Sequence, residues 1–516
     1  MKSKRLIHLC VSLLSTLALV FVSFGPAQPA EATAAEQGKY GGILKIIMRK
    51  SPINFGNPTR IIGSDMNYAI PFLERLLSVG EGGVYLPELA TSWQTAPDGK
   101  SITFNLRQGV VFHDGTEFNA KAVKFNYDRI IPTGYLSGVT SLDVVDDYTV
   151  RINLSTPNNL ILYSLASMSA CHIISPTAFQ KHGEDWADTH PIGTGPFILQ
   201  TYDRNAGLTC TRNPDYWDKG LPYLDGMEIM VVPDAMSAMT FFKAGGAHEY
   251  YDCSFETGAE LRDAGYSVFI APAGIEGYIF ETSPGSVFTN PKVRQAIEYA
   301  INKEDICYGP GLNFFTPMYQ LSIDASPYYN KNLIPRKYDP DKAKQLLAEA
   351  GLGNGFTFKY NAPHDQWRDA IAAEQSNLAQ VGIIMDINFV SSAINTQIKK
   401  GKLGAGEASH MKFQIYPNTL HTIDLYLRSD SAQYGFMVRP AGIDELINQA
   451  KLAQNEDSKA KIIQQIAKLV YDDEPFVPLW TSPRIVVVGE SVQDHGWFIN
   501  GDSNNTKYGR STWLKK

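Results

Sequence analysis

Two short motifs contain residue types that could act on phosphates or peptides, and each lacks a partner that its chemistry requires. Gly99-Lys100-Ser101 resembles the end of a phosphate-binding loop, but Gln94 stands where the loop needs its first glycine. His248-Glu249 begins a zinc-protease motif, in which two histidines one helical turn apart hold the metal. Asp252 occupies the place of the second histidine, so the motif is incomplete.

Two serine–lysine pairs match part of the pattern of penicillin-recognising enzymes. They are Ser409-x-x-Lys412 and Ser458-x-x-Lys461, and the sequence contains no Lys-Thr-Gly partner for either. A chain of 516 residues is long enough to contain such partial matches by chance. We therefore expect a protein that is not an enzyme and that uses no cofactor.

Histidines offer the one alternative that involves a metal. His364, His410 and His421 are isolated, and no two of them are four residues apart, as a two-histidine helical site would need. A nickel or metallophore ligand stays open as an alternative on these three residues, although solvated histidines explain them as well.

The first residues have the order of an export signal. Lys2, Lys4 and Arg5 precede a mostly apolar stretch from residue 6 to 24, and small residues follow, with Ala30-Glu31-Ala32 fitting a cleavage site. This order predicts a signal peptide over residues 1–32 and a periplasmic protein, with an uncleaved membrane anchor as the alternative. Cys10 lies too early for lipid attachment.

Charge and composition exclude some partners. The net charge is −7, and removal of residues 1–32 takes away three basic residues and one acidic residue, which leaves −9. An acidic surface argues against nucleic acid as a partner. Charged residues make up 19% of the chain, as in ordinary globular proteins.

Strand-like and helix-like stretches alternate along the chain, which predicts an α/β protein. Residues 91–95 and 102–106 read as a hairpin around Pro97-Asp98-Gly99. Helices are expected after Asn119, Asn290-Pro291 and Asp339-Pro340, where a cap residue comes before an apolar stripe. Further helices are expected over 366–381 and 456–471, and further strands over 383–390 and 484–489.

Seven segments of the chain are recognisable by their sequence. They lie at residues 86–129, 192–197, 212–217, 290–306, 338–351, 377–383 and 473–480, and an entry strand at 41–44 precedes them. The most specific segment, 86–129, reads LPELATSWQTAPDGKSITFNLRQGVVFHDGTEFNAKAVKFNYDR. In this order the segments resemble family 5 of the extracellular solute-binding proteins of ABC importers, the group that includes dipeptide-, oligopeptide- and nickel-binding proteins.

The resemblance implies a periplasmic-binding-protein type II-like α/β fold with three lobes and closure about a hinge. Lobe I would comprise residues 39–80, 192–282 and 485–516, an inserted lobe II residues 81–191, and lobe III residues 283–484. The protein would be a monomer that captures a peptide or peptide-like solute and delivers it to a separate ABC permease and ATPase. A periplasmic chaperone that holds peptides is an alternative of a different class.

In the family's peptide binders an aspartate holds the amino terminus of the ligand and a basic residue holds its carboxylate. The segment around residues 416–424 lies where those proteins carry a Trp-x-x-Asp motif, which is absent here. Arg368 near a helix start is the candidate partner for an anionic ligand, with pairing to Asp365 or Asp369 as the alternative. The residues expected to bind ligand are Phe55, Tyr278, Trp367, Arg368, Tyr416, Asn418 and Asp424.

Some of these residues have a second explanation. Trp367 and Tyr416 could stack on ligand or pack in the core, and Asp424 could hold an ammonium group or cap a helix. Export also permits disulfides. Because the implied lobes place Cys210 and Cys253 together, they form the predicted disulfide, with four buried free thiols as the alternative.

Overall fold

The computed structural model describes residues 38–61, 65–80, 84–324, 326–363, 367–401, 403–416, 418–453, 455–498 and 507–516. The predicted signal peptide over residues 1–32 lies outside these residues, as do His364 and Asp365. Among the described helices none is both long and apolar enough to cross a bilayer.

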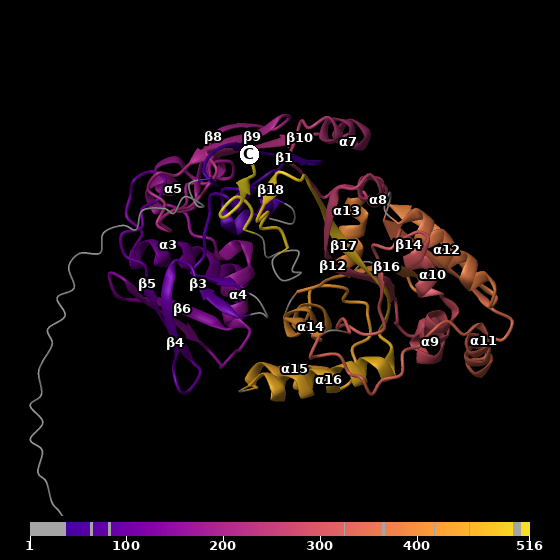
Figure 1. The fold of residues 1–516 in the computed structure, drawn as a ribbon. Helices are drawn as coiled ribbons and strands as arrows, with labels where there is room; N and C mark the ends of the chain where they lie inside the picture. The colour runs from indigo at the N-terminus through magenta and orange to yellow at the C-terminus, as the bar shows by residue number, and fades with distance from the viewer. Residues whose placement is uncertain are drawn as a thin grey trace, which may run out of the picture. The chain divides into compact units, whose positions relative to one another are not determined.

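One large mixed sheet runs through the described part of the chain (Figure 1). It contains 11 strands, and β13 (Thr316–Pro317) pairs with β17 outside the main order. That order is β15 (Ile383–Val390), β14 (Phe356–Pro363), β16 (Ala408–Gln414), β12 (Ser267–Phe280), β17 (Phe476–Val488), β11 (Glu249–Tyr251), β1 (Ile43–Met48), β10 (Gly226–Val231), β9 (Gly207–Arg212) and β8 (Phe197–Asp203).

The strands β12 and β17 join the two halves of this sheet. They are 14 and 13 residues long, and they pair antiparallel from Ser267 opposite Val488 to Ile279 opposite Phe476. The pairing is irregular between Pro272 and Gly274 and again between Glu276 and Gly277, where bulges increase local bending. The same two strands therefore belong to both halves.

A separate four-stranded antiparallel sheet lies between residues 90 and 154, in the order β4 (Ala90–Thr95), β5 (Ser101–Leu106), β7 (Thr149–Leu154) and β6 (Val139–Asp146). The expected hairpin is confirmed, since Thr95 pairs with Ile102. Helix α3 (Ala120–Ile130) packs on this sheet, and their apolar side chains form a core of their own between residues 76 and 173.

Local signals explain where the helices begin. The side chain of Asn119 accepts hydrogen bonds from the backbone amides of Lys121 and Ala122, as an N-cap does. Asn290 and Asp339 cap their helices in the same way, with proline at the next position. The helices that follow these two caps are α9 (Pro291–Ala300) and α11 (Pro340–Glu349). The helices expected over 366–381 and 456–471 are α12 (Arg368–Ala379) and α16 (Glu456–Asp473).

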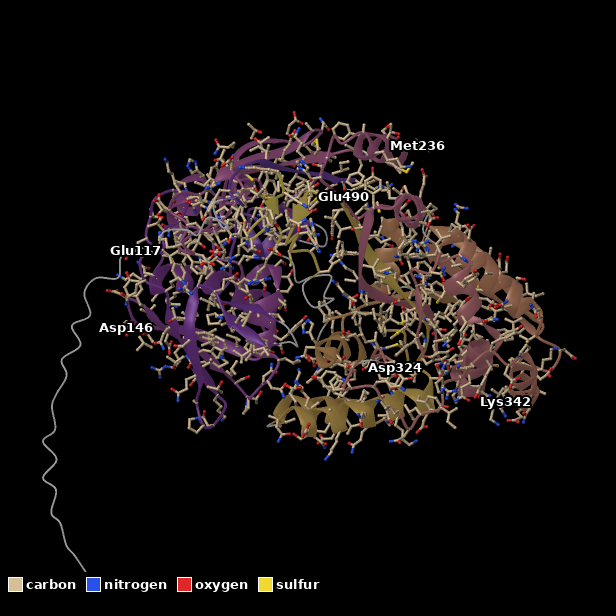
Figure 2. The ribbon with its side chains drawn as sticks, viewed as in Figure 1. Glu117, Asp146, Met236, Asp324, Lys342 and Glu490 are labelled. Atoms are coloured by element: carbon tan, nitrogen blue, oxygen red, sulfur yellow. The ribbon has the colours of Figure 1, made fainter. Side chains whose placement is uncertain are left out.

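The remaining helices of five or more residues are α4 (Ile161–Ser167), α5 (Pro176–His182), α7 (Ala235–Lys243), α8 (Phe255–Asp263), α10 (Lys303–Tyr308), α13 (Ser392–Lys399), α14 (Thr419–Leu427) and α15 (Ile443–Leu452). Charged side chains such as Glu117, Asp146 and Glu490 are exposed to solvent (Figure 2).

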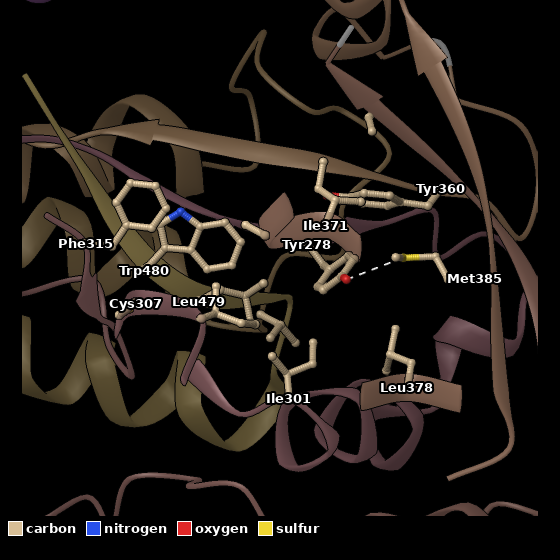
Figure 3. Packing of buried hydrophobic residues seen from close by; sticks show 14 of the residues in the cluster. Tyr278, Ile301, Cys307, Phe315, Tyr360, Ile371, Leu378, Met385, Leu479 and Trp480 are labelled. Carbon is tan, nitrogen blue, oxygen red and sulfur yellow. Dashed lines mark hydrogen bonds between the residues drawn. The ribbon is translucent and has the colours of Figure 1, made fainter. Parts of the chain in front are cut away.

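The largest core lies between the sheet and helices α8 to α12. The ring of Trp480 stacks on that of Phe315 with centroids 5.8 Å apart, and Tyr278 lies near Tyr360 and Met385 (Figure 3). Every apolar residue of the predicted stripe on α9 is buried, from Val293 to Ile301. Aromatic stacking and close packing together make this core specific in geometry.

The predicted disulfide between Cys210 and Cys253 is not formed. Cys210 lies on β9 and Cys253 follows β11, with β10 and β1 between them. Three strand spacings correspond to about 14 Å, whereas a disulfide needs α-carbons within about 7 Å. All four described cysteines are buried free thiols, and burial raises the pKa of each to about 12.

Glu249 on β11 is a buried acid with one hydrogen-bond donor. Its Oε2 accepts from Trp497 Nε1 at 2.7 Å, and its Oε1 has no partner among the described residues. The Trp497 ring is stacked between Tyr251 and Tyr508 at 4.3 and 4.2 Å, so the donor is fixed in place. Burial raises the pKa of Glu249 to about 8, and the hydrogen bond from Trp497 only partly opposes this.

We therefore expect Glu249→Gln to stabilise the protein above pH 5. The raised pKa means that the folded state holds its proton while the unfolded state loses it, so the wild type loses stability as pH rises from 4.5 towards 8. The gain for the variant should be about 1 to 3 kcal/mol at pH 7 and near zero at pH 4. Urea unfolding at both pH values measures it, and an equal effect at both would contradict the assignment.

Candidate ligand-binding site

The carboxyl ends of two sets of parallel strands face each other along β12 and β17. Strands β1, β10 and β11 are parallel, and so are β14, β15 and β16. Tyr251 at the end of β11 lies opposite Val486, while Gln414 at the end of β16 lies opposite Gly274, which pairs with Ser482. The two ends are therefore four residue steps apart along β17, from Val486 to Ser482, or about 13 Å.

Open α/β sheets bind ligands outside the carboxyl ends of their strands, where loops and helix starts present polar groups. Here two such edges meet at one place, which makes the strand segments between them the candidate site. Because residues paired across strands share a face, Arg484, Ser482 and Glu276 lie on one side of the strand pair. Lys412 pairs with Glu276 and joins them there. We define the crossover site as Tyr251, Glu276, Lys412, Ser482 and Arg484.

Glu276 is the central acceptor of the crossover site. It is fully buried, and it accepts hydrogen bonds from His410 Nε2 at 2.8 Å and from the hydroxyl of Ser482. Lys412 Nζ lies 3.0 Å from its Oε1. Burial alone would raise the pKa of Glu276, but Lys412, His410 and Ser482 together outweigh it and lower that pKa to about 2. Glu276 is therefore an anion at neutral pH.

Cationic and neutral donors surround this one acid. Lys412 keeps 41% of its side chain exposed, so its ammonium group also faces solvent. Arg484 Nη1 donates to the Tyr251 hydroxyl at 3.4 Å, and Asn67 Nδ2 donates to the same hydroxyl at 2.8 Å. The missing side chain of Gly274 leaves room here, because a Cβ would lie 3.0 to 3.2 Å from Lys412, Glu276 and Ser482.

This arrangement suits the binding of a polar solute better than catalysis on it. Glu276 lies between Ser482 and His410, whereas a serine nucleophile needs the histidine directly beside it as a base. His410 Nδ1 is 2.8 Å from the Tyr360 hydroxyl, so both of its ring nitrogens are engaged. Lys412 beside Glu276 and Arg484 beside Tyr251 are two cations on one face of the strand pair, and they can hold a ligand carboxylate or peptide carbonyl.

Trp367 and Arg368 follow β14, and Arg368 is the first residue of α12, so it lies at a helix start as predicted. Trp367 has the left-handed φ of 68° and begins α12, and its ring packs on Phe255 and Phe315 at 5.4 and 5.3 Å. The Arg368 guanidinium lies 4.3 Å from the centre of the Phe389 ring, a cation–π contact. Both residues therefore make packing contacts, and their part in ligand binding stays a prediction.

Phe55 and Tyr278 do not reach this edge. Both are 0% exposed, with Phe55 between Tyr68, Phe72 and Tyr202, and Tyr278 bonded to Glu374. Phe55 lies in a loop and Tyr278 lies on β12, and the side chain of each is buried in a core. Tyr278 also lies on the far side of the second bulge, so the strands cross between the two halves before Tyr278 and not at it.

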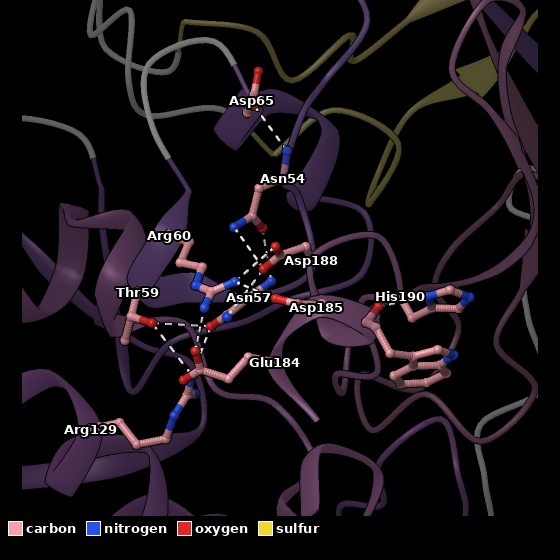
Figure 4. A network of polar contacts seen from close by, with 11 residues as sticks. Asn54, Asn57, Thr59, Arg60, Asp65, Arg129, Glu184, Asp185, Asp188 and His190 are labelled. Carbon is pink, nitrogen blue, oxygen red and sulfur yellow. Dashed lines mark hydrogen bonds and ion pairs between the residues drawn. The ribbon is translucent and has the colours of Figure 1, made fainter. Parts of the chain in front are cut away.

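The loop that carries Phe55 is held by a polar network (Figure 4). Asp188 accepts from Asn54 Nδ2 at 3.1 Å and from Asn57 Nδ2 at 3.2 Å, and pairs with Arg60 at 3.1 Å. Asp65 accepts from the backbone amides of Ile53 and Asn54. These bonds tie the loop to the inserted segment.

Tyr416, Asn418 and Asp424 lie together but contact protein groups. Tyr416 packs edge-on against Tyr163 and His421, with ring centroids at 6.3 and 4.6 Å. Asn418 is 7% exposed and precedes α14. Asp424 pairs with Lys451 at 2.6 Å and with Arg428 at 3.8 Å, so its charge is already compensated.

Sequence reasoning missed the residues of the crossover site. One signal was available, because Glu276, Lys412 and Arg484 are charges inside otherwise apolar strand stretches. Among the described residues no group of three or more possible metal ligands was found, and His364 lies outside those residues. His421 is largely buried, which lowers its pKa to about 4.

Replacing Glu276 by glutamine should destabilise the protein at pH 7 by about 3 kcal/mol. The lowered pKa contributes stability above pH 4.5 that is lost as pH falls towards 2, so the penalty should shrink over that range. Glu407→Gln is the matched control, since Glu407 pairs with the exposed Lys359 and should cost less than about 1 kcal/mol. A pH-independent penalty would contradict the charged state of Glu276.

Comparison with known proteins gives the family. The model for bacterial extracellular solute-binding proteins, family 5 Middle, matches residues 84–430. The glutathione-binding protein GsiB of Escherichia coli O1:K1 / APEC is 28% identical over 421 residues, covering 76% of this chain and 79% of GsiB.

Two solved structures share the fold. The periplasmic binding protein DppA from Helicobacter pylori, in complex with the peptide STSA, superposes with a TM-score of 0.79 at 24% identity and covers 94% of this chain and 100% of DppA. NikA from Brucella suis, in complex with Fe(III)-EDTA, gives 0.80 at 23% identity and covers 90% and 99%. The fold is thus of the periplasmic-binding-protein type II class, and because the family model spans most of the chain, this protein belongs to the family 5 bacterial extracellular solute-binding proteins.

Proposed function

We propose that this protein captures a small peptide or peptide-like solute outside the cytoplasmic membrane and delivers it, as a monomer, to an ABC permease and its ATPase. The observation that carries the proposal is the meeting of two carboxyl edges at the crossover site, with Lys412 beside the Glu276 carboxylate and Arg484 beside the Tyr251 hydroxyl. GsiB, a relative over most of the chain, is named for binding glutathione, a tripeptide with two carboxylates.

The crossover also refines the proposed lobes. The division into 39–80, 192–282 and 485–516, with 81–191 inserted and 283–484 as lobe III, remains a proposal. We place the hinge within β12 at residues 272–274, where a bulge interrupts the pairing, and within β17 at 482–485. This hinge moves the proposed start of lobe III from residue 283 to near Gly274, because β16 pairs with β12 from Gly274 onwards. A ligand that contacts both edges binds the closed arrangement of the lobes more tightly and therefore favours closure.

We propose that the ligand carries a carboxylate that binds Lys412 and Arg484, with Trp367 and Arg368 at the border of the same site. Lys412→Met should then weaken glutathione binding at least tenfold, in line with roughly 2 to 5 kcal/mol for a buried charge pair. Lys359→Met is the control, since Lys359 is 44% exposed and pairs with one glutamate in the same sheet, as Lys412 does.

Isothermal calorimetry measures this for glutathione, dipeptides and the same dipeptides with amidated carboxyl termini. We expect amidation to cost as much affinity as Lys412→Met and to add nothing in that variant. Equal affinities for free and amidated peptides would exclude the carboxylate contact, and turnover of any of these solutes would reject the binding function.

Export by a cleaved leader is part of the same proposal. The basic, apolar and small-residue order over residues 1–32, together with membership of an extracellular family, supports a mature chain that begins near Thr33 without a lipid anchor. Mass spectrometry of protein recovered from the periplasm should give that terminus. A chain that begins at Met1, or an acylated Cys10, would contradict it.

A further inference from the structure

Asn159, which lies just before α4, contacts a helix that is distant in the sequence. Asn159 Nδ2 donates to the carbonyl oxygens of Ala450 and Ala453 at 2.9 and 3.2 Å, and its backbone amide donates to the carbonyl of Lys451 at 3.1 Å. These carbonyls end α15, where a helix lacks donors of its own. One residue of the inserted segment therefore caps a helix nearly 300 positions later in the chain.

The neighbours of Asn159 extend this contact. Leu160 is 3% exposed and is buried in the core formed by residues 275–476, although it precedes α4. Tyr163 lies edge-on to Tyr416 and 5.4 Å from the His421 ring. The contact thus combines directional hydrogen bonds with a buried leucine and aromatic packing.

Asp424 and Lys451 hold together α14 and α15, against which the inserted segment packs. Their ion pair at 2.6 Å joins α14 to α15 and places the Lys451 carbonyl beside Asn159. The segment from Tyr416 to Asp424, which the sequence suggested for ligand binding, therefore receives the inserted segment.

The inserted segment is tied to the half of the sheet that contains β1. Glu74 accepts from Tyr216, Trp217 and Thr194 at 2.7 to 2.8 Å and pairs through its backbone with Ile173. The Asp188 network adds a second tie (Figure 4). Any opening at the crossover must therefore separate Asn159 from α15.

We propose that Asn159, Leu160 and Tyr163 form a clasp that docks on α14 and α15 and holds the closed state of this binding protein. The clasp rests on the proposed function only in its effect on affinity. A contact made in the closed state alone raises the closed population, and with it the affinity for a ligand that the clasp never contacts.

The test replaces Asn159 by aspartate, which sets a carboxylate against carbonyl oxygens at the negative end of a helix. Asn158→Asp is the matched control, because the side chain of Asn158 forms hydrogen bonds with the backbone of Ser137 and Leu160, both within the inserted segment, and none with α15 among the described residues. Asn159→Ala, which removes the two side-chain bonds without adding charge, is the second variant. Thermal unfolding confirms that each variant is folded.

Spin labels at Lys121→Cys on α3 and Lys461→Cys on α16 report the separation of the two sides, since both positions are exposed. The four described native thiols are buried with raised pKa values, so labels go to the new sites. In ligand-free protein we expect a short-distance population that Asn158→Asp keeps and that both Asn159 variants lose in favour of longer distances. A parent without that population, or Asn159 variants that match the control, would overturn the clasp.

Glutathione calorimetry adds a second readout. The Asn159 variants should bind about tenfold more weakly than Asn158→Asp, because the closed population falls. If glutathione binds no variant, the proposed ligand fails while the distance measurement still decides the clasp. Weaker binding in Asn159 variants with unchanged distances would also overturn it, since affinity would then depend on something other than closure.

Discussion

The pairing of β12 with β17 is the constraint on which the rest of the structure depends. Both strands run through the two halves of the large sheet, so each half must build its remaining strands onto the same pair. Because β16 runs antiparallel to β12 and β11 antiparallel to β17, the carboxyl edges of both halves are directed at the segment between them. A polar site at this crossover follows from strand direction alone, before any side chain is considered. The bulge between Pro272 and Gly274 interrupts the ladder at the same place, which is where a bend costs least.

Three buried glutamates show how the surroundings of an acid decide its charge. Glu276 has a lysine, a histidine and a hydroxyl around it, and its pKa falls to about 2. Glu249 and Glu374 each receive one neutral donor, from Trp497 and Tyr278, and burial raises the pKa of each to about 8. The charged acid is thus the one at the crossover, where its lysine also faces solvent. The other two are neutral core residues that link elements by hydrogen bonds. A buried carboxylate is therefore charged where cationic and hydrogen-bonding partners surround it and neutral where they do not.

The inserted segment gives the two halves of the large sheet a second point of contact, in addition to β12 and β17. The ties of Glu74 and Asp188 on one side and the Asn159 contacts on the other span the two halves at a distance from the crossover. The residues of 416–424 take part in this contact through Tyr416, and through the Asp424 pair that positions α15.

The sequence by itself determined the local elements and the family. Cap residues such as Asn119 and Asn290, the apolar stripe of α9 and the hairpin at residues 91–106 act within a few positions, so periodicity and turn chemistry were sufficient to predict them. The residues of the crossover site could not be found from such local patterns. Glu276 meets His410 across 134 positions and Ser482 across 206, and only the pairing register of β12, β16 and β17 brings these side chains to one face. The register of β12 also turned Tyr278 into the core, and the strand order of the large sheet kept Cys210 and Cys253 three strands apart. Register depends on the burial of whole strand faces at once, and no single stretch of the sequence contains that information.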